Sequence, residues 1–93
     1  MHFEWDENKR LSNLIKHGID FADATAVFSD ERRISRVDQR NDYGEIRIKT
    51  IGKMQEKLVA AVIHTDRNNN LRLISARSAN KTERKQYYGN SQL

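Results

Sequence analysis

The fold is decided by three runs of strand-forming residues between residues 43 and 77: YGEIRIKTIG at 43–52, KLVAAVIHTDR at 57–67 and LRLISAR at 71–77. Only a few residues separate one run from the next, and Gly52 at the first junction and Asn68–Asn70 at the second suit turns. The economical arrangement of such runs is a three-strand antiparallel meander. We expect its hairpin turns at Gly52–Glu56 and Asp66–Asn70.

The first run predicts a sheet with two unlike faces. It alternates strictly, and successive side chains of a strand point to opposite sides of the pleat. One side carries Ile46, Ile48 and Thr50, and the other carries Glu45, Arg47 and Lys49. One face is therefore expected in the core, and the charged face is a surface suited to a polyanion.

The other two runs support the same sheet. Leu58 to Ile63 is apolar on both sides, as expected of a central strand. The third run has Leu71 and Leu73 on one face and also carries Arg72 and Arg77.

The net charge of +4 hides an asymmetry between two parts of the chain. Residues 1–30 hold three Lys and Arg against six Asp and Glu, whereas residues 31–93 hold fourteen against seven. The basic charge therefore belongs to the expected sheet and to the C-terminal residues after it. Such a surface attracts nucleic acid by releasing counterions from phosphates, although a merely solvated basic surface has the same composition.

The chain of 93 residues has the length of one domain with a modest core. We expect a single domain over 1–93, mainly helical in 1–30, with an antiparallel sheet in 31–77 and a helix in 80–88. The absence of cysteine excludes disulfides and thiolate metal sites and fits a reducing cytoplasm. No apolar run approaches transmembrane length, and the acidic residues Glu4 and Asp6 interrupt the N-terminal segment where a signal peptide would need an apolar core. The sequence thus indicates a soluble cytoplasmic protein.

Two short helices are expected at the N-terminus, after an edge strand at Phe3–Trp5. Asp6 and Asp20 have the chemistry of N-caps, and Gly18 stands where a left-handed C-terminal cap is needed. The apolar stripe of the first helix consists of Leu11, Leu14 and Ile15, and that of the second consists of Phe21, Ala24, Val27 and Phe28. With the sheet, these helices predict an α+β fold.

Two further elements complete the prediction. Arg33–Val37 is expected to be a short strand, which gives the antiparallel sheet three to four main strands. Asn80 and Glu83 have the spacing of a capping box, which opens a C-terminal helix at Lys81–Tyr88. This helix is mostly polar, so we expect it to be weakly held or held by a partner.

Several blocks of the chain form one pattern, in order and with compatible spacing. They are WDENK at 5–9, NLIKHGIDF at 13–21, AVFSD at 26–30, YGEIR at 43–47, TDR at 65–67 and ISARSA at 74–79, followed by ER at 83–84. Together they resemble the BrnT family of toxins. The resemblance implies a RelE-like fold, a ribonuclease activity that stops translation, and a BrnA-like antitoxin. That antitoxin would carry a ribbon-helix-helix domain, neutralise the toxin and bring the complex to operator DNA.

The cations of the expected meander are candidates for contact with RNA phosphates. Cleavage without a metal needs a base near the attacking 2′-hydroxyl, an acid near the leaving oxygen and fixed positive charge around the phosphorane. Arg67 and Arg77 are the first candidates because both lie in blocks of the family pattern, and Arg47 is the next. Lys49 and Arg72 are candidates for RNA binding. For each of them the alternative is a solvated surface cation.

The proton-transfer groups are less well marked. Glu45 shares a strand face with cations, which make a carboxylate a weaker base, so a cross-strand salt bridge is the alternative. His17 is suited to proton transfer near neutral pH, or it compensates the dipole at a helix C-terminus. His64 could face the basic surface, and Tyr43 could stack on a base or pack against the sheet edge.

Neither a metal site nor a cofactor is expected. His2, His17 and His64 have no close ligand spacing, and no carboxylate cluster accompanies them. Besides a toxin-type endoribonuclease, two interpretations remain open: a non-catalytic RNA-binding module, and an interaction protein that mainly holds an antitoxin. No sequence motif for direct DNA recognition is present.

Overall fold

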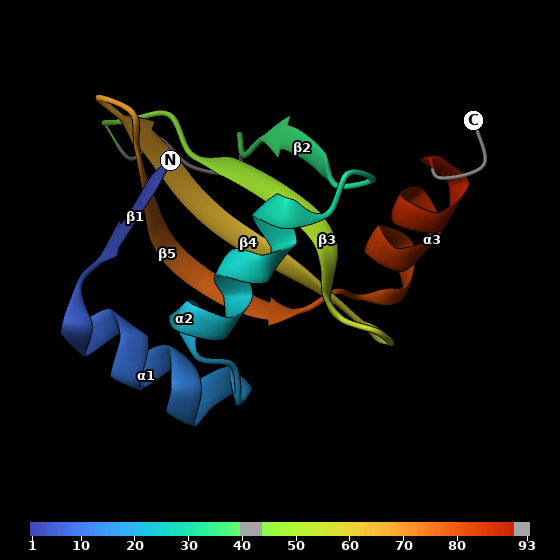
Figure 1. The fold of residues 1–93 in the computed structure, drawn as a ribbon, viewed down its shortest axis with the longest axis horizontal. Helices are drawn as coiled ribbons and strands as arrows, with labels where there is room; N and C mark the ends of the chain where they lie inside the picture. Colours follow the sequence, from blue (N-terminus) through green and yellow to red (C-terminus); the bar gives the residue numbers. More distant parts are fainter. Residues whose placement is uncertain (40–43, 91–93) are drawn as a thin grey trace.

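The computed structural model describes residues 1–39 and 44–90, and in these residues five strands form one sheet in the order β1-β5-β4-β3-β2 (Figure 1). The strands are β1 (His2–Trp5), β2 (Ile34–Val37), β3 (Ile48–Gln55), β4 (Leu58–Arg67) and β5 (Asn70–Ser78). The expected meander is confirmed as β3, β4 and β5, which pair antiparallel in succession.

The prediction of an antiparallel sheet with three to four main strands is wrong. The sheet is mixed, because β1 joins as a fifth strand and pairs parallel with β5. Between β1 and β2 the chain crosses one face of the sheet through its N-terminal helices and reaches the opposite edge (Figure 1). A pairing between residues 2–5 and 70–73 has no local sequence signal, so the alternation of single runs did not predict it.

The helical elements cover this face in chain order: α1 (Glu7–His17), α2 (Phe21–Ala24) and the 3₁₀ helix η1 (Thr25–Ser29). The prediction of two N-terminal helices is therefore wrong for the second helix, which is α-helical over only four residues and continues as a 3₁₀ helix. The predicted caps are confirmed. The Asp6 carboxylate accepts from the backbone N–H of Asn8 at 2.8 Å, and the Asp20 carboxylate accepts from that of Ala22 at 3.0 Å. Gly18 ends α1 with φ +72°, a conformation that side chains with a Cβ rarely adopt.

The main core lies between these helices and the sheet. Phe21, Ala24 and Val27 are fully buried there. The sheet contributes Ala60, Val62, Leu71, Leu73 and Ala76. η1 approaches β3 so closely that a Cβ on Gly52 would lie 3.0 Å from the Val27 side chain, so glycine is needed at that position.

The apolar stripe predicted for α1 does not face the core. Leu11, Leu14 and Ile15 are exposed, Ile15 at 87%. Asn13 is the buried residue of this helix instead. Its side-chain oxygen accepts from the backbone N–H of Ala76 on β5, and its side-chain nitrogen donates to the C=O groups of Ala76 and Ile19. Asn13 thus satisfies backbone groups of β5 beyond the last β1 pair at Leu73.

The helix α3 (Lys81–Asn90) packs on the other face of the sheet, at one end. Its Tyr87 is 2% exposed, lies against Ile51, Val59 and Ala61, and donates its hydroxyl to Asp30 at 2.5 Å. Burial and this hydrogen bond raise the pKa of Tyr87 to about 12. The polar sequence predicted a weakly held helix, but this buried tyrosine anchors it to the sheet. In the described ranges, no helix has both the length and the apolar character needed to cross a bilayer.

Candidate nucleic-acid interface

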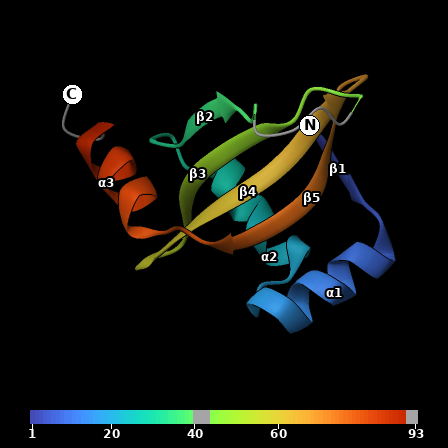
Figure 2. The ribbon, with the colours of Figure 1, turned by 180° about the vertical axis from the view of Figure 1, so that it is seen from behind.

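The side of the sheet opposite α1, α2 and η1 is the candidate site, and we call it the open face. Paired residues on neighbouring strands point to the same side. Two rows of pairs on the open face are Arg36–Lys49–Ile63–Ser75 and Ile34–Ile51–Ala61–Arg77. Figure 2 shows the sheet in front of η1, with α3 beyond the ends of the central strands.

A β-bulge brings Arg77 to the open face. Strict alternation on β5 would put Arg77 on the same side as Leu71 and Leu73, which are buried in the main core. The pairing of β4 with β5 shifts by one residue at Ile63 and His64, so Leu73 pairs with His64 while Arg77 pairs with Ala61. A bulge reverses the side of every residue beyond it. Both Arg72 and Arg77 therefore lie on the open face.

Glu83 is the centre of the most buried group of charges on this face. Its carboxylate accepts hydrogen bonds from both terminal nitrogens of the Arg77 guanidinium, at 2.7 and 2.9 Å, and a third from Lys49 Nζ at 2.8 Å. Glu83 is only 3% exposed, whereas the two cations keep over a quarter of their side-chain surface. We call Glu83, Arg77 and Lys49 the Glu83 cluster.

The electrostatics of this cluster keep Glu83 ionised. Burial alone would raise its pKa, but the hydrogen bonds from Arg77 and Lys49 outweigh burial and lower the pKa from 4.5 to about 2. The predicted capping box is confirmed as well, because Glu83 also accepts from the Asn80 N–H at 2.9 Å. One carboxylate therefore joins two strands of the open face to the start of α3.

A second group, the Glu45 cluster, consists of Glu45, Arg47 and Arg67. Arg47 donates to the Glu45 carboxylate at 3.5 Å and Arg67 donates to it at 3.2 Å. The salt bridge expected as the alternative for Glu45 is therefore present. This cluster is more exposed than the first, and side-chain exposure reaches 55% at Arg67. On the β1 side, Arg72 forms a further pair with Glu4 at 3.1 Å.

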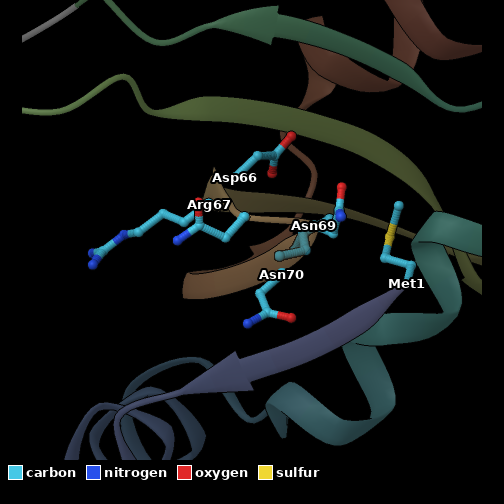
Figure 3. A pocket seen from close by; sticks show the side chains of 7 residues that line it. Met1, Asp66, Arg67, Asn69 and Asn70 are labelled. Carbon is cyan, nitrogen blue, oxygen red and sulfur yellow. The ribbon is translucent and has the colours of Figure 1, made fainter.

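Two cavities lie near these groups. One of about 200 Å³ is lined by Arg36, Val37, Asp38, Gln39 and Lys49, and so adjoins the Glu83 cluster. Another of about 480 Å³ lies at the β4–β5 hairpin, where it is lined by Met1 and residues 66–71 (Figure 3). Only Arg67 is common to the hairpin cavity and the Glu45 cluster. The charges that suit phosphates thus lie on a surface rather than inside the larger cavity.

The expectation that His64 faces the basic surface is wrong. His64 is on the helix side of β4, where its ring packs edge-on against Phe28 with 4.9 Å between centroids. It forms hydrogen bonds of 2.8 Å with Thr50 and with Asp66, and Thr50 contacts Ser35 at 2.7 Å. Burial lowers the pKa of His64 despite the opposing effect of Asp66. The run around His64 is apolar on both sides, so its sequence does not show which side is buried.

Of the two remaining candidates, His17 is not on the open face. His17 lies in the last turn of α1, as the helix-dipole alternative requires, and lines a cavity beside Ile74 and Ser75. Tyr43 lies outside the described residues. In the ranges that are described, no three His, Asp or Glu side chains are grouped so as to hold a metal ion.

Comparison with known proteins identifies the family of this chain. A family model described as the ribonuclease toxin BrnT of type II toxin-antitoxin systems matches residues 5–83. The chain belongs to the BrnT family. The crystal structure of the BrnT ribonuclease toxin from Brucella abortus is also similar, with 33% identity and a TM-score of 0.64 over 87% of this chain and 99% of that one. No curated protein matches the chain.

The BrnT-family match confirms the resemblance drawn from the sequence blocks, and it reaches from Trp5 to Glu83. Glu83 is the residue whose place in the site the sequence did not predict. Its spacing from Asn80 indicated only a helix cap. The contacts of Glu83 with Lys49 and Arg77 depend on how α3 docks and on the bulge in β5, and neither has a sequence signal.

Proposed function

We propose that this BrnT-family chain is a metal-independent endoribonuclease that acts in the cytoplasm, in the RelE-like manner, and inhibits translation. The observation that carries the proposal is the Glu83 cluster, in which two cations from different strands are held side by side on the open face. Positively charged groups fixed in advance stabilise a phosphorane without having to reorganise during the reaction. We expect residues 1–93 to act as one domain.

The proposed reaction is attack of an RNA 2′-oxygen on the adjacent phosphorus. The 2′-hydroxyl loses its proton, the new P–O bond forms a 2′,3′-cyclic phosphate, and the 5′-oxygen leaves with a proton. We assign the stabilisation of the negative charge to Arg77 and Lys49. Arg77 is the stronger candidate because its planar guanidinium matches phosphate oxygens.

The Glu45 cluster adjoins these cations. Arg47 and Lys49 are two residues apart, about 7 Å along an extended chain, so a bound strand of RNA would meet both clusters. We propose Arg67 and Arg47 as further phosphate contacts and Glu45 as the candidate base, while Arg72 extends the RNA-binding surface. For His17 and His64, the geometry gives no support to a role in cleavage.

The partner is inferred from the family. A type II toxin is paired with a protein antitoxin. We propose a BrnA-like antitoxin with a ribbon-helix-helix domain, through which the complex would reach operator DNA. An antitoxin that covers the open face would block the cations from RNA.

The test is incubation of the purified chain with protein-free total RNA in the presence of EDTA. We expect the wild type to cleave RNA, and we expect Arg77→Ala to lower the rate about 10²- to 10³-fold, the range for loss of one group that stabilises transition-state charge. Glu45→Ala should also lose cleavage. Arg32→Ala removes an exposed arginine in the turn before β2, and should cleave like the wild type.

Each other outcome points elsewhere. Cleavage that EDTA abolishes would refute metal independence. Cleavage that appears only with translating ribosomes would refute action on RNA alone. If RNA binds but is cut under neither condition, the chain is a non-catalytic RNA-binding module, and if RNA does not bind at all, its role is to hold the antitoxin.

A further inference from the structure

We propose that Glu83 is a positioning residue of this ribonuclease: from α3, it fixes the directions of Arg77 and Lys49 on the open face. The inference rests on the proposed function, since it assigns a role around the same two cations. It makes α3 part of the active site rather than a helix packed beside it.

The geometry of the contacts supports positioning over a simple surface ion pair. Arg77 and Lys49 come from β5 and β3, which are not neighbours in the sheet, and the same carboxylate reaches both. The contact with Arg77 is bidentate, and a two-point contact fixes the plane of a guanidinium as well as its position. Glu83 itself is buried, so water does not loosen these contacts.

Glu83 is in turn held rigidly by its own helix. Its backbone N–H donates to the Asn80 side chain at 2.8 Å while its carboxylate accepts from the Asn80 N–H, so both ends of the residue are fixed. One turn further on, Tyr87 is buried against the sheet and bonded to Asp30. Docking of α3 therefore delivers the carboxylate to a defined place between β3 and β5.

A positioning carboxylate has opposite effects on binding and on turnover. Its negative charge opposes the approach of a phosphate to Arg77 and Lys49, which weakens RNA binding. Its hydrogen bonds keep the two cations aimed, which speeds the chemical step. Removal of the charge with retention of the shape should therefore tighten RNA binding and slow cleavage at the same time.

The variant that tests this is Glu83→Gln, which keeps the side-chain length and an acceptor for the Asn80 N–H. We expect kcat to fall about 10²-fold, as for a small misplacement of a catalytic group. RNA affinity should rise. The slope of log affinity against log salt concentration should become more negative by about 0.7, the value for one more phosphate neutralised on a single strand. Glu31→Gln, in the exposed turn before β2, makes the same charge change away from the site and should alter neither quantity.

Glu83→Asp separates position from charge. It keeps the negative charge but shortens the reach, so kcat should fall while the salt dependence stays that of the wild type. This variant also carries the test if Glu83→Gln does not fold. Failure of both variants to fold would overturn the proposal, because Glu83 would then serve the fold alone.

Three results with folded Glu83→Gln would overturn the proposal: an unchanged kcat, a raised kcat, or a lowered kcat with weaker RNA binding. The first would make the charge of Glu83 dispensable, the second would make Glu83 an inhibitor, and the third would indicate a purely structural ion pair. A wild-type chain that cleaves no RNA would instead refute the proposed function. The two failures are therefore distinguishable.

Discussion

The two sides of the sheet each bury a polar group, and the two groups are built in opposite ways. On the open face, Glu83 is charged and holds two cations at once. On the helix side, His64 is part of a chain that runs from Ser35 through Thr50 to Asp66. One group concentrates charge at a surface, and the other keeps charge out of the core.

The hydrogen bonds of the His64 chain have one direction when the ring is neutral. An ionised Asp66 only accepts, so Nδ1 of His64 carries the proton and Nε2 accepts from the Thr50 hydroxyl. Thr50 then accepts from Ser35. Thr50 contacts a histidine that in turn contacts an aspartate, as a catalytic nucleophile would, but Thr50 is 1% exposed, so no substrate reaches it. The comparison teaches that the residue types alone do not identify a candidate active site. What distinguishes the Glu83 cluster from the buried His64 chain is that Arg77 and Lys49, the partners of Glu83, are exposed to a substrate.

If the helix side supplies stability and the open face supplies function, the largest loss of stability should come from Asn13→Ala. The substitution leaves the N–H and C=O of Ala76 and the C=O of Ile19 without their buried partner. Each such group costs roughly 1–3 kcal/mol, and we expect a loss of about 3 kcal/mol in the free energy of unfolding, measured by urea denaturation. RNA cleavage per folded molecule should be unchanged.

Asn8→Ala is the matched control on the same helix, because the Asn8 side chain is exposed. It should change the unfolding free energy by less than about 0.5 kcal/mol. A loss of cleavage by Asn13→Ala at full stability would break the division of roles between the two faces.

The second prediction uses pH to separate the two buried groups. Burial lowers the pKa of His64 in the folded chain, so the unfolded chain binds the proton more readily. The contribution of neutral His64 to the free energy of unfolding is therefore fully present above about pH 6.5. Below that pH it is lost, by at most about 1.4 kcal/mol per pH unit. Glu83 acts in another window: its contribution is complete above its ordinary pKa of 4.5 and is lost as the pH falls towards about 2.

The measurement is the urea midpoint from neutral pH to pH 3 for the wild type, His64→Gln and Glu83→Gln. His64→Gln should flatten the decline just below pH 6.5, and Glu83→Gln should flatten the decline below pH 4.5. His2→Gln, at an exposed histidine, should change neither window. If the urea midpoint of His64→Gln fell with pH near pH 6 as steeply as that of the wild type, the His64 ring would not be the buried neutral group described.

Local chemistry accounts for the features that the sequence predicted well. Asp6, Gly18 and Asp20 mark helix ends through their own hydrogen bonds or backbone angles, which depend on a few neighbouring residues. The meander results from short turns between strand-forming runs. Ile48 and Thr50 lie on the inner side of β3 as the alternation indicates, although Ile46, before the strand begins, is 70% exposed.

The features that the sequence did not predict depend on contacts between distant residues. The parallel pairing of β1 with β5 joins residues about 70 positions apart. Arg77 lies on the open face, although strict alternation along β5 would place it on the opposite side, because the β-bulge reverses the side of the residues beyond it. The Glu83 cluster needs that bulge, the docking of α3 and the lysine of β3 together, and no single window of sequence contains all three.

The smallest expected effect tests the misassigned stripe of α1. Ile15 is 87% exposed, so its replacement by glutamine removes almost no buried apolar surface and retains a good helix former. We expect Ile15→Gln to change the unfolding free energy by less than about 0.5 kcal/mol in urea denaturation, against the large loss for Asn13→Ala two residues earlier. Had the stripe faced the core, as its spacing predicted, the same substitution would cost several times more, because a buried isoleucine contributes about 1.5–3 kcal/mol. A cost of that size for Ile15→Gln would mean that α1 is turned about its axis from the orientation described, and it would remove the contact between Asn13 and β5 on which the larger prediction depends.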